Sequence, residues 1–329
     1  MQDIKSFEDE LHGKIKVLNE TTWESKAKKA AIDKWMENFQ TDQERTHALF
    51  LLSNFMYFGS IQIKQLLISL YRDLYKYPII KKIRQSNQNT VDLEFIKSEF
   101  KVAQSKTMFL GMGNASESGN HLLYSFRQEN KLSTSLFGSS NDLFTVDASG
   151  KKALKHAHVN HYVLFDDFCG SGSQALSYAK NNVSEIRALN PDIQISYLML
   201  FATKIGKETV SVMADFNNVE AVVEFDNSFK FFSLDSRYLQ NCSPHINKDF
   251  LKELCERYGE PLVRDIGSRA GFTGSHLDAY VDNAKLGWGG CQLLIGFSHN
   301  IPDNTLPIIW YNEERVTWYP IFKRHNKTY

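Results

Sequence analysis

Residues 161–180 read HYVLFDDFCGSGSQALSYAK. Four apolar residues, 162–165, open the stretch, and so short an apolar run is typical of a strand that is buried on both faces. Two acids follow, then a turn of glycine and serine, and then a helical pattern from Ala175. Strand, acidic pair, turn and helix in this order predict an α/β protein with an anion site in the turn.

The turn and the acids predict two parts of one ligand site. Backbone N–H groups of a glycine-rich turn converge on a phosphate, and the N-terminus of the following helix adds its positive dipole end. Asp166 and Asp167 would repel a phosphate, so we expect them to bind sugar hydroxyls or a divalent cation. A carboxylate pair beside a phosphate cradle outlines a ribose-5-phosphate site. The plainer alternative is a tight turn whose glycine serves packing.

Composition sets the class of protein. The chain has 329 residues, with Lys+Arg and Asp+Glu both at 38, which predicts two domains or one large domain with an appendage. A net charge near zero argues against a general nucleic-acid coat. Four cysteines without a CxxC pair fit a reduced cytosol. We expect a soluble, cytoplasmic protein, because the sequence shows neither an apolar leader nor a run near the ~18 apolar residues of a membrane helix.

Residues 1–100 carry apolar side chains at helical spacing and predict a helical N-terminal region. A break at Gly59 and Ser60 between two such segments is compatible with a helix-turn-helix or winged-helix unit. Lys81, Lys82 and Arg84 would then contact nucleic acid. The alternative, which we favour, is a helical bundle packed on the remaining chain, because helix-turn-helix geometry is common without DNA.

Further apolar strands are expected at residues 106–113, 195–202 and 219–225, with helical segments between them. This alternation predicts a doubly wound parallel sheet, whose ligand lies at the carboxyl ends of the strands. The loop after the first strand offers the backbone amides of Ser118 and Gly119 to an anion.

Two further segments complete the expected domain organisation. The polar stretch 130–160 suits a mobile lid over the ligand. Residues 230–285 suit an insertion, with one helix at 249–258 and a flexible loop that carries Arg264 and Arg269. The expected division is therefore a helical region at 1–100 and an α/β domain at 101–329.

The central stretch resembles the signature of the type I phosphoribosyltransferases: an apolar strand, two acids, two spacer residues and a loop of small residues. The resemblance implies that Asp166 and Asp167 bind ribose and Mg²⁺, and that the loop binds the 5′-phosphate of phosphoribosyl pyrophosphate. It further implies that pyrophosphate lies near Ser118 and Gly119. Two positions depart from the pattern: Gly170 stands where some members carry a catalytic acid, and Gln174 replaces a hydroxyl residue.

The C-terminal part makes the resemblance more specific. Residues 297–310 read FSHNIPDNTLPIIW, and residues 318–324 read WYPIFKR. Together with DDFCGSGSQ they resemble the PRTase-CE family, phosphoribosyltransferase-like proteins of prokaryotic conflict systems. The resemblance implies a place in anti-phage defence, including retrons, where the partner is a reverse transcriptase with its msDNA or another defence protein. Such folds often dimerise, so a homodimer is the default expectation.

The C-terminal loop is also a candidate site for a base. Its polar side chains would bind the base edge, and the rings of Phe297, Trp310 and Tyr311 would stack on the base. The alternative is that these rings close the core.

Three functions remain open from the sequence. The first is an enzyme that acts at the N-glycosidic bond of ribose 5-phosphate, with phosphoribosyl pyrophosphate or a nucleotide as substrate. The second is a catalytically silent nucleotide sensor that binds nucleic acid or a partner protein. The third is a DNA-binding regulator led by the N-terminal helices. The candidate catalytic and metal residues are Asp166 and Asp167, and the candidate substrate-binding residues are Gly170, Ser171, Gly172, Ser173, Gln174, Ser118, Gly119, His299, Asn300 and Asn304.

Overall fold

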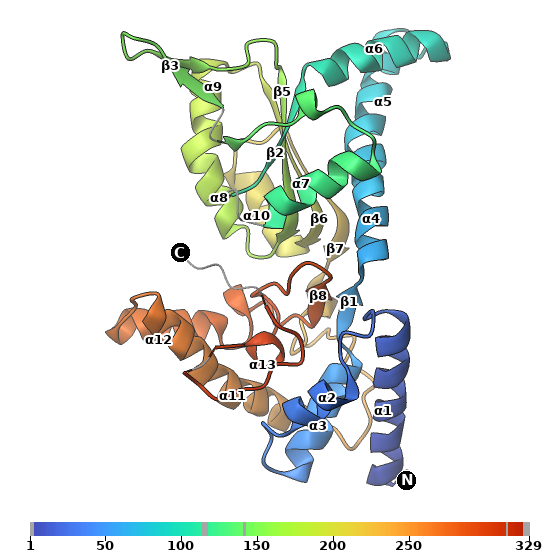
Figure 1. Ribbon diagram of the computed structural model, residues 1–329, viewed down its shortest axis with the longest axis vertical. Coiled ribbons are helices and arrows are strands. Elements are labelled where there is room, and N and C mark those ends of the chain that lie inside the picture. Colours follow the sequence, from blue (N-terminus) through green and yellow to red (C-terminus); the bar gives the residue numbers. More distant parts are fainter. Residues whose placement is uncertain (1–2, 114–117, 141–142, 314, 325–329) are drawn as a thin grey trace. The chain divides into compact units, whose positions relative to one another are not determined.

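The computed structural model describes residues 3–113, 118–140, 143–313 and 315–324 (Figure 1). The chain forms two compact units, the first made of Met1–Ile63 and Asp226–Tyr329, the second of Lys64–Phe225. This division differs from the boundary expected near residue 100. The physical reason is that the N-terminal helices share a hydrophobic core with the C-terminal part of the chain.

The first unit is mostly helical, with one short parallel strand pair, β1 with β8. Its elements are α1 (Ile4–Thr21), α2 (Lys29–Met36), α3 (Asp42–Ser53), β1 (Met56–Phe58), η5 (Asn227–Phe229), α11 (Lys248–Arg269), α12 (Gly274–Ala284), η6 (Trp288–Gly290), β8 (Ile295–Phe297) and α13 (Pro307–Trp310). Helix α3 begins with the expected cap, because the Thr41 hydroxyl accepts from the Glu44 amide at 3.2 Å.

Aromatic residues from both ends of the sequence form the core of the first unit. Trp35 and Trp318 both donate their indole N–H to the carbonyl of Ile308, at 2.8 and 3.0 Å. The Phe55 ring stacks on the Phe322 ring, with centroids 4.6 Å apart. Burial of such large side chains supplies most of the packing energy of a small core. The closing motif WYPIFKR is therefore a core segment of this unit.

The helices on either side of Gly59, considered as a helix-turn-helix unit but not favoured as one, are not joined by a tight turn, because β1 lies between them and pairs with β8. One expectation for this unit is wrong. The expected flexible loop at 264–274 is largely helical, since α11 continues to Arg269. Arg264 pairs there with Glu260 and Asp278, so the insertion is an ordered helical pair.

The second unit contains a four-stranded parallel sheet in the order β2-β5-β6-β7. Its elements are α4 (Ser60–Ser69, which begins in the first unit), η1 (Leu70–Lys76), α5 (Tyr77–Ser86), α6 (Leu93–Ser105), β2 (Thr107–Gly111), α7 (Ser118–Glu129), η2 (Thr134–Leu136), β3 (Phe144–Val146), β4 (Lys152–Leu154), β5 (His161–Cys169), α8 (Ser173–Tyr178), η4 (Ala179–Val183), α9 (Ser184–Leu189), β6 (Gln194–Thr203), α10 (Lys204–Met213) and β7 (Asn218–Phe225). The strands expected at 106–113, 195–202 and 219–225 are confirmed.

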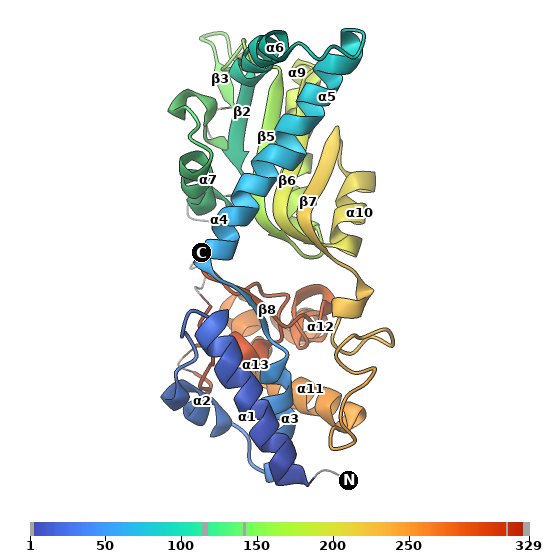
Figure 2. The ribbon, with the colours of Figure 1, turned by 90° about the vertical axis from the view of Figure 1, so that its right-hand side faces the viewer.

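Helices cover both faces of this sheet, which confirms the α/β class. On one face, Phe109 of β2 packs against Tyr75 of η1 and Phe126 of α7. On the other, buried residues of β5 and β6 pack with those of α8, η4, α9 and α10. Figure 2 shows the helix from α4 to α5 crossing the first face. The strand order follows the chain order, so the order does not reverse within these four strands.

Pro78 does not end a helix. The chain passes from α4 through the π-helical segment η1 into α5, with Pro78 in the first turn of α5. Proline has no amide to donate, so a carbonyl one turn upstream loses its intrahelical partner, and the π-helical segment η1 lies at this place. Within the described residues, no helix has the length and apolar character needed to cross a membrane.

Candidate functional site

Asp166 and Asp167 lie inside strand β5 and do not follow it. The strand runs to Cys169, and Asp166 is in register with Met199 of β6. Each acid is 6% exposed. The expected order of strand then acids is thus shifted by four residues, because the spacer residues 168 and 169 continue the ladder with β6. Phe168 and Cys169 separate the acids from the glycine-serine turn.

Asp166 is tied to Tyr197 of β6. The Tyr197 hydroxyl donates to Oδ2 of Asp166 at 2.7 Å, and the Asp167 amide donates to Oδ1 at 2.9 Å. Burial raises the pKa of Asp166 well above its usual range, and the charge of Asp167 raises it further, while the bond from Tyr197 opposes the shift. Burial and the Asp166 charge also raise the pKa of Tyr197. The pair can therefore hold a proton that an exposed aspartate would lose.

A residue at the end of strand β6 holds the turn at 170–172 in place. The Thr203 hydroxyl, at the end of β6, donates to the Gly170 carbonyl at 2.6 Å and accepts from the Gly206 amide at 2.9 Å. One side chain therefore caps α10 and holds the turn after β5. Gly206 permits this approach, because a Cβ there would lie 2.1 Å from the Gly170 oxygen.

The predicted phosphate loop leads directly into α8, η4 and α9, which follow one another without a break. Gly172 has a φ of 82°, and an added Cβ would lie 2.9 Å from Cγ2 of Val210. The hydroxyls of Ser171 and Ser173 are 2.9 Å apart. A helix that begins at Ser173 directs its first N–H groups toward the turn, as an anion cradle requires.

We predict that Thr203→Val loosens this turn and Thr203→Ser does not. Valine keeps the shape but removes both hydrogen bonds, which lowers the free energy of unfolding by about 1–2 kcal/mol. The expected result is faster hydrogen exchange at the amides of residues 170–173 and 206 in the valine variant. Equal exchange in the valine and serine variants would mean that the hydroxyl does not hold the turn.

The second predicted anion loop falls only partly in the described chain. Residues 114–117 lie outside the described residues. Ser118 and Gly119 are the first residues of α7, so they are not loop residues as expected. Their backbone remains at a helix N-terminus that follows β2, the strand beside β5. The pyrophosphate assignment stays a prediction.

The segment expected to be a lid is divided between the two ends of the sheet. Ser140 lies at the carboxyl end, where its hydroxyl is 2.9 Å from the Tyr178 hydroxyl. The hairpin of β3 and β4 lies beside α9 instead, with Lys152 paired to Glu185 (Figure 1). The part of the segment that reaches the carboxyl end of the sheet is therefore the part at Ser140, and lid motion stays a prediction.

His299, Asn300 and Asn304 belong to the first unit, whereas the acids and the turn belong to the second. The Asn304 amide donates to the Trp288 carbonyl at 2.9 Å and holds that loop. Oδ1 of Asn300 is buried and has no hydrogen-bond partner in the described part of the chain. The rings expected to stack on a base are core residues: Phe297 is 2%, Trp310 5% and Tyr311 0% exposed.

A bound Mg²⁺ would need coordinating oxygens from the phosphates of the substrate as well as from the protein. No group of three or more His, Cys, Asp or Glu side chains among the described residues is arranged to hold a metal ion. Mg²⁺ commonly uses one or two carboxylates together with substrate phosphates. The assignment of Mg²⁺ to Asp166 and Asp167 stays a prediction, because both acids are buried and both oxygens of Asp166 already accept hydrogen bonds within the protein.

Sequence analysis missed Tyr197 and the double role of Thr203. The signal for Tyr197 was its position within the apolar run of β6, since a buried tyrosine needs a partner for its hydroxyl. The signal for Thr203 was its place just before a helical segment, where a threonine commonly caps the helix. Gly206, three residues later, indicated that the first turn of this helix lies close to a neighbouring segment.

Three comparisons bear on this geometry. The model of the PRTase-CE family matches residues 32–324. No curated protein matches the sequence significantly. Among solved structures, the xanthine-guanine-hypoxanthine phosphoribosyltransferase of Helicobacter pylori is similar at 11% identity and a TM-score of 0.27, covering 55% of this chain and 94% of that chain.

Proposed function

The chain belongs to the PRTase-CE family, and from this premise we propose that its second unit binds a ribose-5-phosphate ligand, either phosphoribosyl pyrophosphate or a nucleotide. The observation that carries the proposal is the turn at 170–172, held by Thr203 and separated by only two strand residues from the adjacent acids of β5. In this proposal the turn and the start of α8 bind the 5′-phosphate. Asp166 and Asp167 accept hydrogen bonds from the ribose hydroxyls.

We further propose that the ligand reacts at its N-glycosidic bond. The phosphate end would be held by neutral N–H groups, and the acids would lie near the sugar, where positive charge develops as the bond at C1 breaks. Mg²⁺, when bound, would neutralise the phosphates of the ligand. A role in cytoplasmic anti-phage defence, beside a reverse transcriptase with its msDNA or another partner, rests on the family resemblance.

The second candidate is a catalytically silent sensor of the same ligand. The observation that favours it is the burial of both acids, each only 6% exposed, together with the bond from Tyr197 to Asp166. An acid fixed in this way is suited to holding a ligand and less suited to moving with a reaction. Gly170, where some phosphoribosyltransferases carry a catalytic acid, points the same way.

The test is calorimetric titration of the full chain with phosphoribosyl pyrophosphate and ribonucleoside monophosphates, each with Mg²⁺. We expect wild type to bind at least one of them, and Asp166→Asn/Asp167→Asn to lose at least tenfold in affinity, because bonds to charged groups contribute about 1.5–3 kcal/mol each. Glu99→Gln/Asp192→Asn, at two exposed acids of the same unit, controls for the loss of two negative charges. Wild type that binds none of these ligands would refute the proposal, and binding without turnover would select the sensor.

A further inference from the structure

Helices α5 and α6 carry a concentration of positive charge in a chain of zero net charge. Residues 76–106 contain seven Lys or Arg and three Asp or Glu. Four of the lysines are exposed and form no ion pair with any described residue: Lys81, Lys82, Lys101 and Lys106. We call these four residues the lysine surface. Lysines without acidic partners leave a local positive potential that a partner can use.

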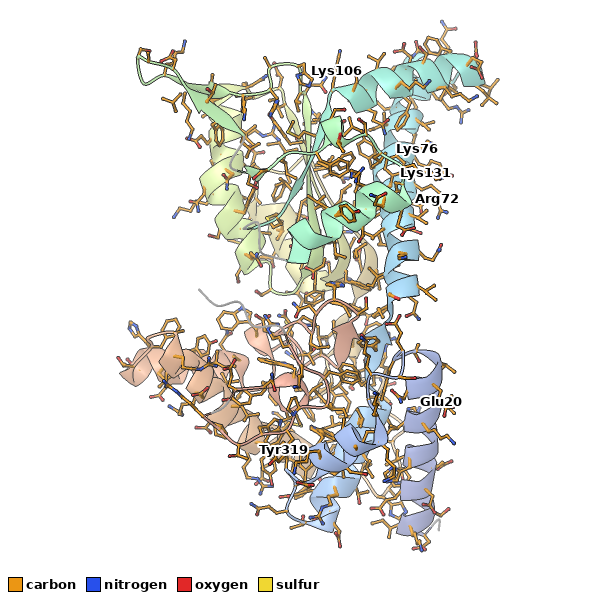
Figure 3. The ribbon with its side chains drawn as sticks, in the orientation of Figure 1. Glu20, Arg72, Lys76, Lys106, Lys131 and Tyr319 are labelled. Atoms are coloured by element: carbon orange, nitrogen blue, oxygen red, sulfur yellow. The ribbon has the colours of Figure 1, made fainter. Side chains whose placement is uncertain are left out.

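Two members of the lysine surface, Lys82 and Lys106, lie at the amino end of the parallel sheet. The Lys106 carbonyl accepts from the amides of Asn160 and His161, where β5 begins. Lys82 lies close enough for its charge to help burial lower the pKa of His161 to about 4. Figure 3 shows Lys106 where α6 leads into β2. The proposed ribose-phosphate site is at the other end of the same strands, so the two regions are separate within this unit.

Exposed apolar side chains accompany the lysines on the same two helices. Helix α5 has no buried residue, and Tyr77 in its first turn is 53% exposed. On α6 and just before it, Val91, Leu93 and Phe95 are 76%, 69% and 37% exposed. Lysines interleaved with aromatic rings are the composition of surfaces that bind single-stranded nucleic acid, where cations contact phosphates and rings stack on bases.

We propose that α5 and α6 form a docking surface for single-stranded nucleic acid, with the lysine surface on the phosphates and Tyr77 and Phe95 against the bases. The charge selects a polyanion, and the exposed rings select one whose bases are unpaired. This surface does not depend on a helix-turn-helix unit. It also does not depend on the ribose-phosphate site.

The test is fluorescence anisotropy of the full chain with labelled single-stranded DNA of about 20 nucleotides, enough for a ~4–16-nucleotide site, across a range of salt concentrations. We expect Lys81→Gln/Lys82→Gln/Lys101→Gln/Lys106→Gln to weaken binding at least tenfold and to flatten the log–log salt slope by up to ~3, at about 0.7 per phosphate contact. The matched control, Lys5→Gln/Lys16→Gln/Lys26→Gln/Lys28→Gln, changes the net charge equally in the first unit. It should bind as wild type does.

Further variants and competitors distinguish single-stranded binding from a folding defect, from duplex binding and from an acidic protein partner. Replacing the same four lysines with arginine should restore binding, which excludes a folding defect. Tyr77→Ser/Phe95→Ser should weaken single-stranded binding about tenfold and leave duplex binding unchanged, because only unpaired bases stack on side chains. Equal loss in the lysine variant and its control would overturn the proposal, as would wild type that prefers a duplex. Displacement of the DNA by polyglutamate as readily as by unlabelled DNA would also overturn it, and would indicate an acidic protein partner.

Discussion

Replacing Gly206 with alanine is expected to lower the free energy of unfolding by about 1–3 kcal/mol, although alanine is the better helix former. The added Cβ would lie 2.1 Å from the Gly170 oxygen and 3.0 Å from the Thr203 hydroxyl oxygen. A backbone carbonyl cannot rotate away as a flexible side chain can, so the turn itself must move. Urea denaturation checks the stability, and phosphoribosyl pyrophosphate titration checks the turn.

Gly13 provides the matched control for this prediction. It lies in helix α1, and an added Cβ there would meet nothing within 4 Å. Gly13→Ala should therefore raise the free energy of unfolding by about 0.5–1 kcal/mol through helix propensity alone. Opposite signs in the two variants identify the contact with Gly170 as the cause. If both variants are stabilised, the turn after β5 is not held against α10 as described.

The parallel sheet could be predicted because its strands are short apolar runs bounded by turn residues. Strands β2, β6 and β7 begin and end within two residues of their expected limits. The C-terminal limit of β5 was harder to predict, since acidic residues normally end a buried strand. Hydrogen bonding of residues 166–169 with β6 keeps the acids in the sheet, and a partner strand far along the chain determines this.

The division into units could not be predicted, because it depends on contacts between the two ends of the sequence. Trp35 and Trp318 share the Ile308 carbonyl, and no local pattern indicates that meeting. The candidate turn was predictable from glycine and serine, which have local conformational signals. Its support by Thr203, and the bond from Tyr197 to Asp166, required the register between β5 and β6.

Replacing Asp166 with asparagine is expected to stabilise the protein at neutral pH by about 1–3 kcal/mol, because a buried carboxyl beside the charge of Asp167 must either ionise or take up a proton at a cost, and asparagine does neither. The folded-state pKa of Asp166 is raised, so the folded protein holds this proton more tightly than the unfolded chain does. The resulting stability is fully present below the unfolded pKa of about 4 and is lost as the pH rises through the folded pKa. Asparagine is neutral throughout, so this loss should disappear.

Asparagine can keep both hydrogen bonds of the aspartate. Its carbonyl oxygen accepts from the Asp167 amide, and its NH₂ group donates to the Tyr197 oxygen, which now acts as acceptor. Asp166→Ala is the contrasting variant, because it leaves the buried Tyr197 hydroxyl without this partner and should cost about 1–3 kcal/mol. Urea denaturation between about pH 5 and pH 8 separates the two effects. A wild-type curve parallel to that of Asp166→Asn would show that this carboxyl is not the titrating group.

The same variant connects stability with function. If Asp166→Asn gains stability and also loses the ribose-phosphate ligand, the chain keeps a destabilising buried acid at the site where the ligand needs it. If it gains stability and binds the ligand unchanged, the ribose contacts belong to Asp167, and Asp166 with Tyr197 forms a proton-binding pair below the site. One protein preparation gives both results, because urea denaturation measures the stability and calorimetry measures the ligand affinity.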